Sequence, residues 1–218
     1  MIDFYTSPTP NGHKVSIALE EMQIDYNLIN VDLRAGEQKA ESYLALNPNG
    51  RIPTIVDRAN DDFVVFESGA ILMYLGDLSG KYFPSDAKTR SQVIQWLMFQ
   101  MGGIGPMMGQ ANVFVRYMPE TIQPAIDRYQ TEVKRLFTVL DTHLARNEFL
   151  AKDYSIADMA NWAWVRTHKW PKVEINDSPN LSRWVDEIGQ RPAAQAGIEI
   201  PPKIDVEELL KSAKAIVK

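Results

Sequence analysis

The pattern of apolar and polar residues predicts that strands and helices alternate in the first part of the chain. Residues 2–6 form a short apolar run typical of a buried strand, and residues 11–22 place apolar side chains at helical spacing. Residues 25–32 alternate between apolar and polar side chains, as a half-buried strand does. A strand, a helix and a second strand within about thirty residues predict two parallel strands joined by a right-handed crossover.

The residues that follow predict a hairpin between two helices. A short helix is expected around residues 39–46. Residues 52–57 and 63–66 have strand patterns separated by a polar turn, and a helix is expected from Glu67 to Gly80. The element order is therefore β-α-β-α-β-β-α, which predicts an α+β domain.

The remainder of the chain carries helical patterns and no convincing strand. Residues 80–87 combine Gly, Pro and Ser with aromatic side chains and are interpreted as a linker. The expected domains are thus residues 1–80 and an all-helical domain over residues 88–218. The helices of this domain are predicted at residues 88–108, at 120–146, from Tyr154-Ser155 onward, and at 179–190. Ser155 and Asp158 have the spacing of a capping box at the start of the third helix.

Composition narrows the classes of function. The net charge of -5 disfavours a nucleic-acid surface, which needs clustered Lys and Arg. No apolar run approaches the roughly 18 residues of a membrane span, and the first residues lack a secretory pattern, so a cytoplasmic location is expected. The chain has no cysteine and its three histidines are scattered, so no disulfide framework, metal site or cysteine nucleophile is expected. Any thiol chemistry must use a thiol that a ligand brings.

Four features occur in an order that resembles the glutathione-transferase family over essentially the whole chain. They are the opening strand-helix-strand unit, Ile52-Pro53, Glu67-Ser68-Gly69-Ala70-Ile71 and Tyr154-Ser155-Ile156-Ala157-Asp158. Ser7 to Lys14, Asn47 to Pro53 and Gln100 to Gln110 are similar to segments of the bacterial Nu-class group, which includes glutathione-dependent disulfide-bond reductases. The resemblance implies a thioredoxin-like N-terminal domain, an all-α C-terminal domain, glutathione as bound co-substrate, no metal and a homodimer.

Glutathione has a zwitterionic γ-glutamyl end, a central thiol and a glycine carboxylate. Glu67 and Ser68 are expected to bind the γ-glutamyl end, because a helix N-terminus favours a carboxylate and Glu67 can pair with the amine. The alternative is that Ser68 only caps the helix. The resemblance implies that the Ile52-Pro53 bond is cis and that the Ile52 backbone pairs with the ligand's cysteinyl backbone, as an added strand would.

Three further polar residues are candidates for glutathione binding. Gln38 and Arg51 would reach the glycine carboxylate, and the resemblance implies that Arg128, in the second domain, also reaches the glutathione site. The alternative for all three is a solvated polar side chain, which is the usual state of such residues.

Thr9 and Asn11, at the start of the first helix, are the candidates for activating the glutathione thiol. Thr9 suits the N-cap position and Pro10 the first helical position. A thiolate placed there would gain hydroxyl and amide hydrogen bonds and the helix dipole, all of which lower a thiol pKa. Tyr5 is the alternative, because several transferase classes use a tyrosine near the end of the first strand. Its place before the turn favours a core role.

The sequence leaves three functions open. The first is a glutathione-dependent disulfide-bond oxidoreductase, in which glutathione supplies both thiols because the chain has none. The second is a glutathione transferase that conjugates glutathione to a small electrophile. The third is a non-catalytic, glutathione-binding regulator. The Thr9-Pro10-Asn11 turn favours the first, and the intact Glu67-Ser68 pair disfavours the third.

Overall fold

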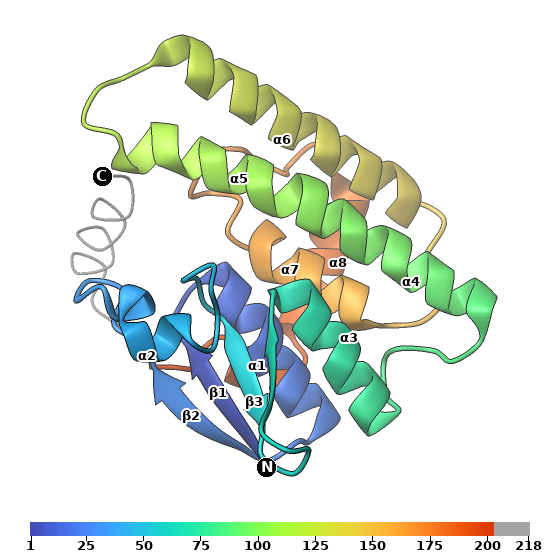
Figure 1. Ribbon diagram of the computed structural model, residues 1–218. Helices are drawn as coiled ribbons and strands as arrows, with labels where there is room; N and C mark the ends of the chain where they lie inside the picture. The colour runs from blue at the N-terminus through green and yellow to red at the C-terminus, as the bar shows by residue number, and fades with distance from the viewer. Residues whose placement is uncertain (203–218) are drawn as a thin grey trace. The chain divides into compact units, whose positions relative to one another are not determined.

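The computed structural model describes residues 1–202, which form two compact units (Figure 1). The first consists of Met1–Tyr82 together with the described chain from Pro192, and the second of Phe83–Arg191. The boundary after Tyr82 falls within the predicted linker. The helical domain was predicted to extend to residue 218, but residues 192–202 group with the first unit, and residues 203–218 lie outside the described residues.

The first unit is built on a four-stranded mixed sheet with the predicted thioredoxin-like order. The strands β1 (Ile2–Thr6), β2 (Tyr26–Asn30), β3 (Thr54–Asp57) and β4 (Phe63–Phe66) lie in the order β2-β1-β3-β4. β1 is parallel to β2 and antiparallel to β3, and β3 is antiparallel to β4. The expected parallel pair followed by a hairpin is therefore confirmed.

Helices pack beside this sheet. α1 (Pro10–Met22) lies behind the strands in Figure 1 and packs against both α3 (Ser68–Ser79) and α9 (Pro192–Gly197). The short helix predicted at residues 39–46 is a 3-10 turn, η1 (Glu37–Lys39), followed by a single helical turn, α2 (Glu41–Leu44).

A close backbone contact joins α9 to α1. Ser16 Oγ donates to the carbonyl oxygen of Gly197 at 2.6 Å. A Cβ atom at Gly197 would lie 2.7 Å from the Cα and N atoms of Ile17, so only glycine allows this approach. This contact spans most of the chain and explains why α9 belongs to the first unit.

In the second unit, the helix predicted over residues 88–108 is longer than expected and contains π-helical turns. It comprises α4 (Ala87–Phe99), η2 (Gln100–Ile104), α5 (Gly105–Asn112) and η3 (Val113–Tyr117). Hydrogen bonds from Gly105 N to Gln100 O and from Met118 N to Val113 O have the wider π spacing. The first of them lies in the glycine-rich segment and the second at the end of the helix.

Three more helices agree with the sequence prediction to within a few residues. They are α6 (Gln123–Leu144), α7 (Ile156–Val165) and α8 (Pro179–Gly189). α7 packs against α4, α5 and α8, and it is buried along nearly its whole length. The all-helical character predicted for this part of the chain is confirmed within Phe83–Arg191.

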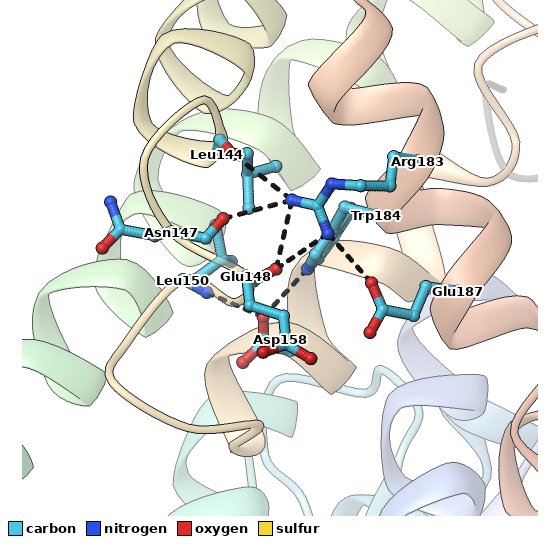
Figure 2. A network of polar contacts seen from close by, with 8 residues as sticks. All are labelled: Leu144, Asn147, Glu148, Leu150, Asp158, Arg183, Trp184 and Glu187. Carbon is cyan, nitrogen blue, oxygen red and sulfur yellow. Dashed lines mark hydrogen bonds and ion pairs between the residues drawn. The ribbon is translucent and has the colours of Figure 1, made fainter.

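The capping box predicted at the start of α7 is present. Ser155 Oγ accepts from Ala157 N at 3.3 Å, and Asp158 Oδ2 accepts from Ser155 N at 3.0 Å. Asp158 Oδ1 also accepts from Leu150 N at 2.9 Å and from Trp184 Nε1 at 3.0 Å (Figure 2). Asp158 is fully buried, and this burial raises its pKa to about 6 although the hydrogen bonds oppose the shift.

Arg183 of α8 holds the end of α6 (Figure 2). Its Nη2 donates to the carbonyl oxygens of Leu144 at 3.3 Å and Asn147 at 3.1 Å, and its Nη1 donates to Glu187 Oε2 at 2.9 Å. A cation at the C-terminal end of a helix pairs with carbonyls that have no partner inside the helix.

Within residues 1–202, no helix is both long enough and apolar enough to cross a membrane. The same residues contain no group of three or more His, Cys, Asp or Glu side chains that could hold a metal ion.

Candidate functional site

Strand pairing brings the ends of three strands together at one edge of the sheet. Thr54, the first residue of β3, pairs with Tyr5 near the end of β1 and with Phe66 at the end of β4. The residues that follow β1, precede β3 and follow β4 therefore lie together at this edge. They include three of the predicted groups: Thr9 with Asn11, Ile52-Pro53, and Glu67-Ser68.

Thr9 occupies the predicted N-cap position of α1. Its Oγ1 accepts from Gly12 N at 3.2 Å, and Pro10 is the first helical residue. A Cβ atom at Gly12 would overlap Thr6 Oγ1, so glycine lets the first turn of α1 approach the end of β1. Thr9 and Asn11 are only half-buried, which leaves both within reach of a ligand.

The Ile52-Pro53 bond is cis, as predicted. Two side chains hold Arg51, the residue before Ile52. Tyr43 Oη and Asn47 Nδ2 each donate to the carbonyl oxygen of Arg51 at 2.7 Å. Both side chains also lie within hydrogen-bond distance of Thr54 Oγ1, at 2.9 and 3.2 Å. Sequence reasoning missed these two residues, because a buried Tyr and a turn Asn have no pattern that distinguishes them from ordinary core and turn residues.

Gly50, which precedes Arg51, allows the backbone there to approach the backbone of Gln38, the other candidate for the glycine carboxylate. Gly50 has a φ of 60°, and a Cβ atom there would lie 2.9 Å from the carbonyl oxygen of Gln38. Gln38 is 8% exposed, and its Oε1 has no hydrogen-bond partner among the described residues. The Arg51 side chain is exposed. A buried amide oxygen without a partner is unusual, and a bound donor or water would satisfy it.

The Glu67-Ser68 pair forms the N-terminus of α3. Glu67 is the N-cap residue, with a φ of 69°, and its side chain makes no capping hydrogen bond. Its exposed carboxylate instead accepts from Asn49 Nδ2 at 3.5 Å. Ser68 is the first helical residue and is buried, so it does not occupy the N-cap position that the structural alternative required.

A residue that the sequence analysis did not select joins this pair. Lys14 of α1 is 1% exposed, and its Nζ donates to Ser68 Oγ at 3.2 Å. Burial lowers the pKa of Lys14 to about 7, although the Glu67 carboxylate acts in the opposite direction. A lysine on a helix normally reaches solvent, so no sequence pattern indicated that this one turns inward.

Two other predicted residues differ in their surroundings. Tyr5 is half-buried, and its ring packs edge-on against Tyr43 with 6.2 Å between ring centroids. Arg128 belongs to the second unit, where its 67% exposed side chain lies 3.8 Å from Glu132. Its part in glutathione binding stays a prediction.

The sheet edge therefore displays complementary polar groups. Two helix N-termini, those of α1 and α3, favour negative charge. Glu67 offers a carboxylate for an amine, and the backbone before β3 is held in place for pairing with an extended ligand. A short peptide that carries an amine, a carboxylate and an anionic sulfur would match these groups.

Two family models match the chain. The glutathione S-transferase N-terminal domain matches residues 2–77, and the glutathione S-transferase C-terminal domain matches residues 101–192.

Individual proteins that are similar to the chain agree with the two family models. The disulfide-bond oxidoreductase YfcG of Escherichia coli (strain K12) is 43% identical over 198 residues, which cover 88% of this chain and 92% of YfcG. A glutathione transferase from Burkholderia graminis, solved with two glutathione molecules per subunit, has a TM-score of 0.88 at 41% identity and covers 93% of this chain and 89% of its own. One from Pseudomonas putida, solved with one glutathione disulfide per subunit, has a TM-score of 0.88 at 40% identity and covers 92% of this chain and 91% of its own.

Proposed function

The chain belongs to the glutathione S-transferase family, and on this premise we propose that it is a glutathione-dependent disulfide-bond oxidoreductase. The observation that carries the proposal is the lack of cysteine in a chain that is similar to a disulfide-bond oxidoreductase. Without a thiol of its own, the chain can reduce a disulfide only with thiols that glutathione supplies.

The reaction then proceeds in two exchanges. The thiolate of a bound glutathione attacks one sulfur of the substrate disulfide, forms a mixed disulfide, and releases the other sulfur as a thiolate that takes up a proton. A second glutathione thiolate attacks the mixed disulfide at the glutathione sulfur. It yields glutathione disulfide and the second substrate thiol, so two glutathiones are oxidised for each disulfide reduced.

The residues at the sheet edge have distinct tasks in this proposal. Glu67 and Ser68 bind the γ-glutamyl end, the Ile52 backbone pairs with the cysteinyl residue, and Gln38 and Arg51 bind the glycine carboxylate. In this proposal the glutathione sulfur lies near the start of α1. There the hydroxyl of Thr9, the amide of Asn11 and the helix dipole stabilise the thiolate and lower the thiol pKa.

The activity is tested by paired assays of the purified protein, with glutathione and either a small disulfide or a chlorinated aromatic. Oxidation of glutathione to glutathione disulfide as the small disulfide is reduced to its thiols supports the proposal. Turnover of the chlorinated aromatic alone would identify a transferase. Glutathione binding without either turnover would identify a non-catalytic binder.

A second test identifies the group that stabilises the thiolate. Thr9→Val removes a hydrogen bond to a charged acceptor worth roughly 1.5–3 kcal/mol, so the bound thiol pKa should rise by about one to two units. Disulfide reduction should fall near neutral pH and partly recover as the pH rises. Tyr5→Phe should leave the pH profile unchanged, and the opposite pair of results would assign the role to Tyr5.

We also propose that the chain is a homodimer in which Arg128 contributes to glutathione binding. Sedimentation at micromolar concentration should give twice the monomer mass of 24.7 kDa. Sedimentation as a monomer alone would contradict the dimer.

A further inference from the structure

Lys14 is a buried cation next to a residue of the proposed site. It lies one turn into α1, is 1% exposed, and its Nζ is 3.2 Å from Ser68 Oγ. Lysine is rarely buried to this extent, because its ammonium loses hydration unless partners replace the water. A methionine or leucine would fill the same volume without this loss. The position therefore calls for an explanation beyond packing.

The direction of the hydrogen bond is fixed by chemistry. An ammonium has three donors and no acceptor, whereas a serine hydroxyl can both donate and accept. While Lys14 is protonated, Ser68 Oγ is therefore the acceptor, and its own hydrogen must point away from Lys14. A carboxylate that arrives at the N-terminus of α3 meets a hydroxyl whose orientation Lys14 has already set.

We propose that Lys14 is a positioning residue of the γ-glutamyl subsite, which orients the Ser68 hydroxyl and supplies the positive charge that balances the ligand's α-carboxylate. This inference rests on the proposed glutathione binding. With Glu67 beside it, the subsite has a cation for the α-carboxylate and an anion for the α-amine. It therefore selects ligands that carry a free α-amino acid end.

The surrounding charges predict how binding depends on pH. Glu67, at the start of α3, is the charge that raises the pKa of Lys14, whereas burial lowers it to about 7. α3 also carries Tyr74, which bonds to a carboxylate of β3, and Asp77 near its far end. His13 is the neighbour of Lys14 on α1, and α9 has no titratable side chain.

A ligand carboxylate near Ser68 raises the pKa of Lys14 above its value in the empty site. Binding then takes up protons at neutral and mildly alkaline pH. Affinity should be highest below pH 7, and it should fall by up to tenfold per pH unit as the pH rises from about 7 to the pKa of the bound form.

The first experiment uses S-methylglutathione, whose sulfur cannot ionise, and measures its dissociation constant by calorimetry between pH 6 and pH 8. Wild type should bind more weakly as the pH rises. Lys14→Met should bind about tenfold more weakly than wild type at pH 6.5, because it loses a hydrogen bond from a charged donor, and its affinity should not depend on pH. Lys134→Met, which removes an exposed lysine of α6, should behave as wild type.

The second experiment needs no variant. Calorimetry of wild type at pH 7.5 in two buffers with different ionisation enthalpies measures the protons that binding takes up. A measurable fraction of a proton per ligand is expected, and zero uptake would contradict the proposal. This result decides the matter even if Lys14→Met does not fold.

A double-mutant cycle tests whether Lys14 acts through Ser68. The effect of the double variant on the dissociation constant should be clearly smaller than the product of the Lys14→Met and Ser68→Ala effects, because one removes the Ser68 hydroxyl and the other removes the group that orients it. If Lys14→Met binds S-methylglutathione with wild-type affinity and pH profile, the role of Lys14 is refuted while glutathione binding stands. If wild type fails to bind glutathione or S-methylglutathione, the proposed function fails as well.

Discussion

The N-termini of α3 and α7 begin in different ways. At α7 the capping box of Ser155 and Asp158 is complete, and Asp158 accepts hydrogen bonds from the backbone and from Trp184. At α3 the N-cap residue, Glu67, has a left-handed backbone and makes no side-chain capping bond. The first N–H groups of a helix have no carbonyl partner inside the helix. At α7 the Ser155 side chain accepts from one of them, whereas at α3 the side chain of the N-cap residue accepts from none.

The partners of the buried charges at these two sites, Asp158 and Lys14, indicate whether each charge serves stability or ligand binding. The partners of Asp158 are backbone N–H groups and core side chains, so the removal of Asp158 should lower the free energy of unfolding. Lys14 donates to Ser68, a residue of the proposed site, so the removal of Lys14 should lower the affinity for glutathione. The four predictions below test this division.

The largest effect is expected from Asp158→Ala. The variant leaves the buried donors of Leu150, Ser155 and Trp184 without an acceptor, and each unsatisfied donor costs about 1–3 kcal/mol. The free energy of unfolding should fall by at least about 3 kcal/mol, as measured by urea denaturation. Asp153→Ala, at an exposed position in the same loop, should change it by less than about 0.5 kcal/mol.

Asp158→Asn should remove a specific pH dependence of stability. Burial raises the folded-state pKa of Asp158 to about 6, whereas the unfolded value is about 3.9. The stabilisation from this group is therefore fully present below about pH 3.9 and is lost as the pH rises through about 6. The stability difference between wild type and Asp158→Asn should shrink by up to about 3 kcal/mol from pH 4 to pH 7. A constant difference over this range would show that Asp158 stays ionised in the fold.

Smaller effects are expected from two serine substitutions, one mainly on stability and the other mainly on glutathione affinity. Ser155→Ala removes a capping hydrogen bond and should lower stability by about 1 kcal/mol without changing glutathione affinity. Ser68→Ala should lower glutathione affinity, which Ser155→Ala leaves unchanged, and any loss of stability should come from the lost hydrogen bond to Lys14 and not from a lost cap. Calorimetry and urea denaturation on both variants check the two halves, and a loss of affinity in Ser155→Ala alone would reverse the comparison.

The smallest effect concerns the backbone of Glu67. Its φ of 69° is unfavourable for any residue with a Cβ atom, and glycine adopts it without strain. Glu67→Gly should therefore be more stable than Glu67→Ala by up to about 1 kcal/mol, although both should bind glutathione more weakly than wild type. Equal stability of the two variants would show that this backbone conformation carries no strain.

The sequence predicted best what depends on neighbouring residues. The capping box at Ser155 and Asp158 lies within four consecutive residues, and the N-cap at Thr9 is adjacent to the proline that begins the helix. These interactions are local, so residue types at fixed spacing are sufficient to indicate them. The order of the elements along the chain followed from the same alternation, whereas the thioredoxin-like arrangement of the strands was implied by the family resemblance.

The sequence could not predict contacts between distant residues. Lys14 has the pattern of a solvated helix residue, and its inward direction depends on Ser68, 54 positions later. The π-helical turns likewise depend on hydrogen-bond spacing, which the glycine-rich segment did not reveal. Tyr43 and Asn47 lie only eight and four positions before Arg51, but their residue types alone did not distinguish them from ordinary core and turn residues.

The packing of α9 on α1 has a consequence for how the protein is made. The Ser16–Gly197 hydrogen bond spans 181 residues, so the ribosome must synthesise nearly the whole chain before α9 can pack on α1. At about 5–20 residues per second, this delay is roughly 10–40 s. The helical unit is synthesised during that interval, and its end at Arg191 precedes Gly197 by only six residues, so Met1–Tyr82 must wait for the whole helical unit before it gains the contact with α9.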